Sequence, residues 1–218
     1  MPRAPGDGGI IVTLTPASWL TLCGGLLSSV SILIFFDAAS APGGTRWFAL
    51  GAACMFGGLF FDALDGLVAR RFHWESELGK RLDSLCDAIS YLIAPAVALR
   101  VLGASGFWPS LAVLAMIATG LLRLAHFTIA GNVQAAGRLA YLGLPSYYSH
   151  FALVLLIFVH ARLSWLFEPL LIAILFPMSA LFIYNRTFTK PMNPFVMFPI
   201  IGALILGSLL VFVFQVPV

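Results

Sequence analysis

Charged side chains are scarce in this chain. Only 10% of its 218 residues are charged, 61% are hydrophobic and the mean hydropathy is +1.00, whereas a soluble domain carries about 25% charged residues. This composition excludes an ordinary soluble globular protein. The net charge of +3 is small, and the chain has no basic tract interleaved with aromatic residues. It therefore lacks the pattern of a nucleic-acid-binding protein.

Cysteine is also scarce. The three cysteines, Cys23, Cys54 and Cys86, are widely spaced and lie within apolar segments. Their spacing matches neither a disulfide framework nor a zinc site. Buried free cysteine behaves as a small hydrophobic residue, so we expect these three to be packing residues.

Long apolar runs dominate the rest of the chain, and each is close to the roughly 20 residues that a membrane-spanning helix needs. They are too long and continuous for the strands of a membrane barrel. The sequence predicts an all-α polytopic transmembrane bundle of about six to eight spans, forming one domain over residues 1–218. The first run lacks a convincing small-residue cleavage site and is expected to be a retained helix. Seven segments can be drawn, at about 18–36, 46–70, 79–101, 108–127, 145–162, 166–184 and 195–215.

The basic residues predict an orientation, because loops on the cytoplasmic side carry an excess of Lys and Arg. With the N-terminus in the cytoplasm and seven alternating spans, three arginines fall on the far side, namely Arg46, Arg100 and Arg162. Nine basic residues fall on or near the cytoplasmic side, namely Arg3, Arg70, Arg71, Lys80, Arg81, Arg123, Arg138, Arg186 and Lys190. We expect an integral protein of a bacterial or archaeal cell membrane.

Acidic residues are few and strongly clustered. Of nine in the chain, six lie between positions 62 and 87, and four of these are aspartates in apolar surroundings. An unpaired carboxylate in a bilayer costs at least about 2.5 kcal/mol. Four together therefore indicate a bound cation or a cationic substrate, at the cytoplasmic end of the second and third spans.

The spacing of these residues defines two helix faces. On the second segment, one face carries Asp62, Asp65, Gly66 and Ala69. On the third segment, one face carries Gly79, Asp83 and Asp87. Residues three or four apart share a helix face, so an antiparallel pair of these helices would point four carboxylates at one another. Such a cluster repels itself unless it is protonated or holds a metal, and oxygen ligands suit Mg²⁺ or Mn²⁺.

Small and basic residues beside the aspartates allow two interpretations. Gly66, Ala69 and Gly79 leave room for a ligand against the backbone, or they are helix-packing positions. Arg70 is suited to a phosphate, or it is an arginine that reaches toward the membrane surface.

The complete pattern is Asp62-x2-Asp65-Gly66-x2-Ala69-Arg70-x8-Gly79-x3-Asp83-x3-Asp87. It resembles the signature of the CDP-alcohol phosphatidyltransferase family at every position. The resemblance implies that the four aspartates hold one or two divalent cations, Mg²⁺ or Mn²⁺, and that Asp87 is the general base. It also implies a CDP-linked donor, an alcohol acceptor, release of CMP and a homodimer. The implied site for the CDP moiety is lined by Asp62, Asp65, Gly66, Ala69, Arg70, Gly79 and Asp83. Ser76 either binds the nucleotide or caps a helix.

Residues outside this signature bear on which alcohol is the acceptor. The segments 82–96, 123–128 and 143–145 most resemble the family branch that transfers a phosphatidyl group from CDP-diacylglycerol to serine. His126 and Thr128 depart from that branch, which typically has Arg and Asn there. Arg123, His126 and Arg138 are the candidate acceptor-binding residues.

Three alternatives stay open. The same chemistry with another acceptor, such as glycerol phosphate or an inositol derivative, is the nearest. An intramembrane prenyltransferase also binds a diphosphate through Mg²⁺, but it normally has more helices and lacks the Gly66-x2-Ala69-Arg70 continuation. A cation channel or transporter would use the carboxylates as ion ligands, although Arg70 and Lys80 would repel the permeating ion.

Overall fold

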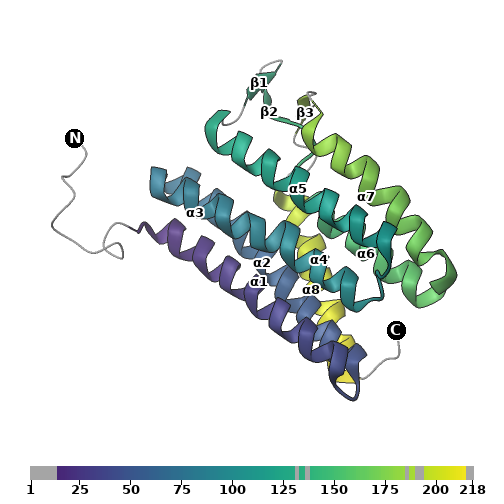
Figure 1. The fold of residues 1–218 in the computed structure, drawn as a ribbon. Helices are drawn as coiled ribbons and strands as arrows, with labels where there is room; N and C mark the ends of the chain where they lie inside the picture. Colours follow the sequence, from purple (N-terminus) through teal and green to yellow (C-terminus); the bar gives the residue numbers. More distant parts are fainter. Residues whose placement is uncertain (1–13, 131–132, 136–137, 185–186, 190–193, 215–218) are drawn as a thin grey trace, which may run out of the picture.

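The computed structural model is a bundle of long helices running side by side (Figure 1). It describes residues 14–130, 133–135, 138–184, 187–189 and 194–214. Arg3, Arg186 and Lys190 lie outside the described residues, and for Arg138 only the backbone is described.

Seven helical rods make up the described part of the chain, as the sequence predicts. The third rod is continuous through three elements, since a π-helical stretch, η2, joins α3 to α4. The helices are α1 (Pro16–Ser40), α2 (Gly44–Phe72), α3 (Glu77–Asp87), η2 (Ala88–Ile93), α4 (Ala94–Val101), α5 (Phe107–Ala130), α6 (Tyr148–Arg162), η3 (Ser164–Leu166), α7 (Phe167–Ile183) and α8 (Pro194–Phe214).

A small antiparallel sheet was not predicted. It is formed by β1 (Val133–Ala135), β2 (Arg138–Leu142) and β3 (Thr187–Thr189), in the order β1-β2-β3. It connects the loop after α5 to the loop after α7, with Ala140 opposite Thr189. The segments are too short for periodicity to reveal them, and they lie at one end of an otherwise helical bundle (Figure 1).

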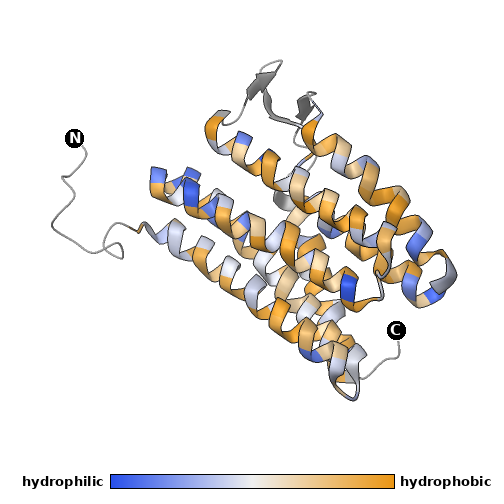
Figure 2. Cartoon of the chain, in the orientation of Figure 1, coloured by the Kyte–Doolittle hydropathy of each residue, from blue (hydrophilic) through white to orange (hydrophobic). Residues whose placement is uncertain are grey.

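Six helices of the described chain are long and apolar enough to cross a membrane, which makes this an integral membrane protein. The helix at the predicted span 145–162 begins only at Tyr148 and has 15 residues. At 1.5 Å per residue it is about 22 Å long, shorter than the hydrocarbon core of a bilayer. Apolar residues line the helices along their length, while polar residues collect near the start of α3 and at the opposite end (Figure 2).

The hydroxyl side chains of Thr15 and Ser76 cap the N-termini of α1 and α3. Thr15 caps α1 by accepting a hydrogen bond from the backbone N–H of Ser18 at 3.2 Å, and Pro16 follows at the first helical position. Ser76 caps α3 in the same way. The turn between α2 and α3 starts at His73, whose left-handed backbone (φ 57°) and N–H bond to the Ala69 carbonyl end α2. This turn reverses the chain direction between α2 and α3, and both helices pack against α1.

Glycines bring α1 and α2 together closely. A Cβ on Gly24 would lie 3.1 Å from the carbonyl oxygen of Gly58, so the two backbones approach through small residues as membrane helices commonly do. Away from the aspartates, the core is a contiguous cluster of large apolar side chains. Its fully buried members include Phe35, Met55, Leu92, Leu99, Met116, Leu153, Leu156, Leu171, Leu175 and Phe182.

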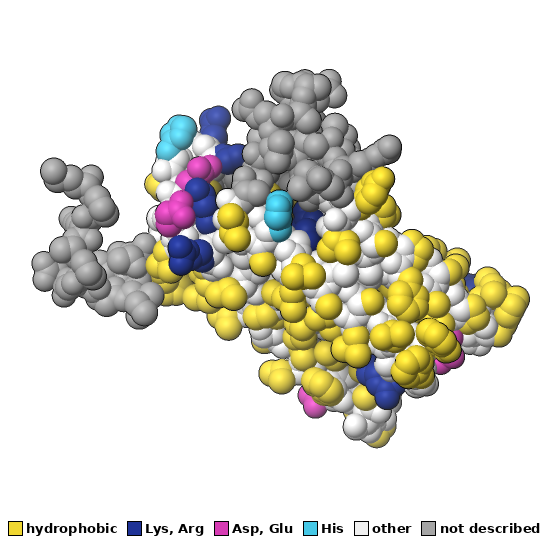
Figure 3. All heavy atoms as spheres, turned by 45° about the horizontal axis from the view of Figure 1, so that its top comes forward, with side chains coloured by type: hydrophobic (Ala, Val, Ile, Leu, Met, Phe, Trp, Pro, Cys, Tyr) yellow, Lys and Arg dark blue, Asp and Glu magenta, His cyan; other side chains and the backbone are white. Residues whose placement is uncertain are grey.

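Charge is concentrated at one end of the bundle. Arg70, Arg71, Lys80 and Arg81 lie around the turn between α2 and α3, and acidic, basic and histidine side chains gather on that surface in Figure 3. The predicted far-side arginines lie at the opposite helix ends, namely Arg46, Arg100 and Arg162.

Candidate active site

A cavity of about 680 Å³ opens at the charged end, where α2, α3, η2 and α5 meet beside the first turns of α1. Every residue of the signature lines it, and so does Ser76. The signature residues are Asp62, Asp65, Gly66, Ala69, Arg70, Gly79, Asp83 and Asp87. A second cavity, of about 510 Å³ and mostly apolar, lies at the opposite end and contains none of them. The two predicted helix faces therefore meet around one cavity.

Three of the four aspartates form a compact group. One carboxylate oxygen from each of Asp62, Asp83 and Asp87 lies within 4.8 Å of the other two. Oxygen donors from carboxylates are the ligands that Mg²⁺ and Mn²⁺ prefer. These three side chains could therefore hold a divalent metal ion.

Asp65 lies apart from this group and is the most buried of the four. Only 5% of its surface is exposed, and its Oδ2 atom has no hydrogen-bond partner among the described residues. A buried carboxylate oxygen without a partner is costly. A cation in the cavity would offset that cost, so the donor set and this oxygen both fit a metal site.

The third rod changes its winding directly after Asp87. Residues 88–93 form a π-helical turn, in which the Ala94 N–H bonds to the Ile89 carbonyl five residues earlier. Such π-turns occur frequently at functional sites. Here the turn accompanies Pro95, which supplies no N–H to the preceding turn. Tyr91, four residues after Asp87, lies within this turn and lines the cavity.

Tyr91 is a site residue that the sequence reasoning missed. It lines the cavity, is only 2% exposed and donates a hydrogen bond from its hydroxyl to Asp62 Oδ2. A signal was present, because Tyr91 continues the four-residue spacing of Asp83 and Asp87. Apolar neighbours made it resemble an ordinary core aromatic.

Gly66 and Gly79, two small residues of the signature, have different surroundings. The nearest contacts of a Cβ on Gly66 would be the guanidinium atoms of Arg70, at 3.5 Å or more, so Gly66 leaves space in the cavity and is not held against another helix. A Cβ on Gly79 would lie 2.9 Å from Ser76 Oγ and 3.0 Å from Ser18 Oγ. Gly79 therefore serves helix packing as well as lining the cavity.

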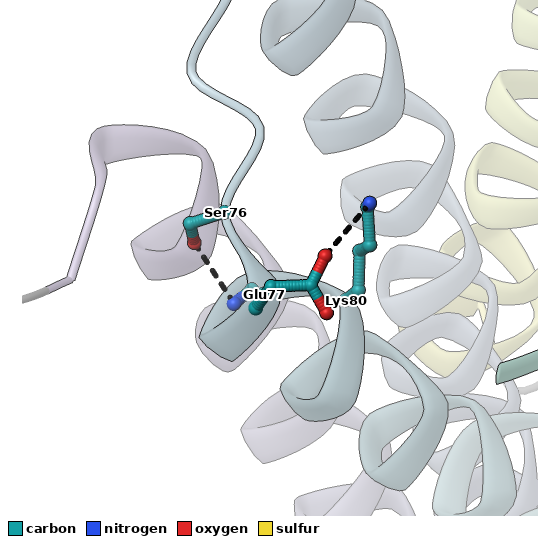
Figure 4. Close-up of polar contacts among 4 residues, drawn as sticks. Ser76, Glu77 and Lys80 are labelled. Atoms are coloured by element: carbon teal, nitrogen blue, oxygen red, sulfur yellow. Dashed lines mark hydrogen bonds and ion pairs between the residues drawn. The ribbon is translucent and has the colours of Figure 1, made fainter. Parts of the chain in front are cut away.

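Ser76 is a helix cap at the rim of the cavity. Its Oγ accepts a hydrogen bond from the backbone N–H of Gly79 at 3.0 Å, and Figure 4 shows it one turn before Lys80. Lys80 forms an ion pair with Glu77 at 3.1 Å. Both partners are exposed, so this pair contributes little to stability.

The three candidate acceptor residues have different positions. Arg123 lines the cavity from α5, is 7% exposed and donates a hydrogen bond to Ser146 Oγ at 3.3 Å. His126 is exposed on the same helix and is not among the residues that line the cavity. Arg138 lies in β2, and its side chain is outside the described part of the structure. Thr128, which departs from the branch pattern, lines the cavity.

Comparison with known proteins identifies relatives of this chain. It is 31% identical over 125 residues to a CDP-diacylglycerol–serine O-phosphatidyltransferase of Bacillus subtilis, covering 55% of this chain and 63% of that protein. It is 39% identical over 90 residues to an enzyme of the same name from Methanocaldococcus jannaschii, covering 40% of each chain. A Saccharomyces cerevisiae protein of that name is 38% identical over 72 residues, or 33% of this chain and 26% of that protein. The chain thus matches less than two thirds of each of these relatives.

The family comparison covers far more of the chain. Residues 14–215 match the model of the CDP-alcohol phosphatidyltransferase family. This range contains all seven helical rods and the entire aspartate cavity. The chain belongs to the CDP-alcohol phosphatidyltransferase family.

Proposed function

We propose that this protein transfers a phosphatidyl group from CDP-diacylglycerol to the hydroxyl of serine, forming phosphatidylserine and CMP. The observation that carries the proposal is the meeting of Asp62, Asp83 and Asp87 in one cavity, in a chain of this family. The names of the relatives support serine as the acceptor.

The aspartates have two roles in this proposal. Asp62, Asp65, Asp83 and Asp87 would hold Mg²⁺ or Mn²⁺, which would supply positive charge to neutralise the pyrophosphate of the donor. Asp87 is also the general base. It accepts the proton of the serine hydroxyl while that oxygen attacks the phosphorus of the phosphatidyl group. The bond from this phosphorus to the CMP oxygen breaks, and the electron pair leaves with CMP.

We propose that the CDP moiety binds in the part of the cavity that is lined by small residues. The open space beside Gly66 and Ala69 lets the nucleotide lie against α2, and the Arg70 guanidinium is available to its phosphates. Ser76 and Gly79 line the same part of the cavity. The diacylglycerol tails stay in the surrounding lipid.

Serine is proposed to bind near Arg123. A buried arginine is a specific partner for a carboxylate, because the guanidinium offers paired N–H donors, and Arg123 lines the aspartate cavity. The hydroxyl of Ser146, already in contact with Arg123, is a further polar group at this position. His126 and Arg138 remain candidates for a contact made at the edge of the site.

The site is proposed to face the cytoplasm of a bacterium or archaeon, with the enzyme acting as a homodimer. The basic residues around the turn between α2 and α3 support this orientation. The homodimer and the single domain over residues 1–218 are expectations that follow from the family resemblance and the size of the chain.

An acceptor panel tests the proposal. The purified protein is given CDP-diacylglycerol, Mg²⁺ or Mn²⁺, and labelled serine, glycerol phosphate or an inositol derivative in turn. We expect CMP release and labelled lipid with serine. Reaction only with another alcohol would contradict the serine assignment and keep the family chemistry. Release of pyrophosphate from a prenyl donor, or metal flux into liposomes without a nucleotide, would favour the prenyltransferase or the transporter.

A further inference from the structure

One buried hydroxyl contacts a member of the three-carboxylate group. Tyr91 is 2% exposed, and its phenol donates a hydrogen bond to Asp62 Oδ2 across the interface between η2 and α2. A hydrogen bond to one oxygen restricts rotation of the carboxylate plane. The direction in which Asp62 presents itself to Asp83 and Asp87 therefore depends on where Tyr91 is held.

The backbone of Tyr91 is held from a third helix. In an α-helix its carbonyl would accept a hydrogen bond from the residue four positions later, but that residue is Pro95, which has no N–H. Ser149 on α6 donates its hydroxyl to this carbonyl at 2.5 Å. The bond links two buried residues that are 58 positions apart, and it supplies a donor to a carbonyl that has no α-helical donor at Pro95.

The ring of Tyr91 is also confined. The buried imidazole of His150 packs edge-on against it, with ring centroids 5.2 Å apart, and the centroid of the Phe56 ring lies 6.0 Å from that of the imidazole. Tyr91 is therefore fixed at its backbone, its ring and its hydroxyl. A side chain held at three points is suited to orienting the carboxylate that it contacts.

We propose that Tyr91 is a positioning residue, which orients Asp62 for binding the divalent cation and is itself braced by Ser149. This inference rests on the proposed function, since it concerns the same metal site. The brace connects α6 through η2 to α2. If Tyr91 orients Asp62, loss of the Tyr91 or Ser149 hydroxyl should weaken binding of the metal ion. If Tyr91 only packs in the fold, its loss should lower stability and leave metal affinity unchanged.

The test is Tyr91→Phe in the full-length protein, which removes one oxygen and keeps the ring. Mn²⁺ binding is measured directly by electron paramagnetic resonance, in the absence of substrates. We expect the dissociation constant for Mn²⁺ to rise by about tenfold, since losing a hydrogen bond to a metal ligand typically costs 10–100-fold. CMP release should fall at limiting metal and recover when the metal is saturating.

Tyr148→Phe is the matched control, because Tyr148 packs against the core and does not line the aspartate cavity. It should bind Mn²⁺ as the wild type does. A double-mutant cycle of Tyr91→Phe with Asp62→Asn should give strongly non-additive losses of Mn²⁺ affinity, because the two residues act through one contact. Ser149→Ala should weaken Mn²⁺ binding in the same direction.

Unchanged Mn²⁺ affinity in folded Tyr91→Phe would overturn the inference. If that variant does not fold, as judged by thermal unfolding in detergent, unchanged affinity in Ser149→Ala would do so instead. A wild-type protein that releases no CMP from CDP-diacylglycerol contradicts the proposed function. A wild type that releases CMP while Tyr91→Phe keeps full Mn²⁺ affinity contradicts the positioning role alone.

Discussion

The hydroxyl of Ser84 on α3 lies 2.7 Å from the hydroxyl of Thr128 on α5. Thr128 also donates its only hydroxyl proton to the Leu124 carbonyl at 2.9 Å, so Ser84 is the donor of the pair. Both side chains line the aspartate cavity, and Ser84 directly follows Asp83. This contact ties the helix that carries the proposed general base to the helix that carries Arg123.

Thr128→Val keeps the shape of the side chain and removes the acceptor for Ser84. We expect the KM for serine to rise about fivefold, the equivalent of one hydrogen bond of about 1 kcal/mol, while the KM for CDP-diacylglycerol stays constant. Thr119→Val is the control on the same helix, because Thr119 donates its hydroxyl to the Ala115 carbonyl of α5 and does not line the cavity. Equal changes in both KM values would contradict a role on the acceptor side.

Asp87→Asn should nearly abolish turnover, because an amide cannot accept the serine proton. General base catalysis typically contributes about 10²–10⁴-fold to the rate, and the loss should be of that size. Thermal unfolding should show that the variant is folded. Asp37→Asn, at the far end of α1 and exposed, should keep wild-type activity. Near wild-type turnover in Asp87→Asn would show that another group is the base.

Removal of divalent metal should stop the reaction. After chelation we expect no CMP release, and addition of Mg²⁺ or Mn²⁺ should restore it, because the carboxylate cluster supplies only hard oxygen ligands. Asp62→Asn should raise both the metal concentration needed for half-maximal rate and the KM for the CDP donor. Full activity in the chelated protein would exclude the metal mechanism.

Arg123→Lys keeps a positive charge and loses the planar pair of donors that fits a carboxylate. The KM for serine should rise, and it should rise further in Arg123→Ala, with the KM for the donor unchanged. Arg100→Lys serves as the control, since Arg100 lies at the opposite end of the bundle and bonds the Ala104 carbonyl. A rise in the donor KM alone would assign Arg123 to the lipid phosphate.

Gly58→Ala should destabilise the fold by about 1–3 kcal/mol, the usual cost of overpacking. A Cβ at Gly58 would overlap the hydroxyl of Ser28 and lie 3.0 Å from the Gly24 carbonyl oxygen, where α1 and α2 pack. Gly202→Ala on α8 is the control, because a Cβ there meets no atom within 4 Å. The midpoints of unfolding in detergent compare the two variants. Equal midpoints would contradict tight packing at Gly58.

The helical spans and the two aspartate faces could be predicted from the sequence alone. Both follow from local rules, because apolar length predicts a span and the helical repeat places residues such as Asp83 and Asp87 on one side of it. The spacing of residues along one helix does not reveal which residues of other helices pack against that face. Gly66 and Gly79 could therefore not be told apart, although one leaves space in the cavity and the other packs against α1.

Which distant residues contact those faces depends on how the helices pack in three dimensions. Tyr91 meets Asp62 from 29 positions away and Ser149 meets the Tyr91 carbonyl from 58 positions away, while the sheet pairs β2 with β3 across α6 and α7. Such contacts have no sequence period, because they depend on how whole helices pack and on acceptors that a proline leaves open. Local periodicity places residues on one face of a helix, and packing between helices determines which residues contact that face.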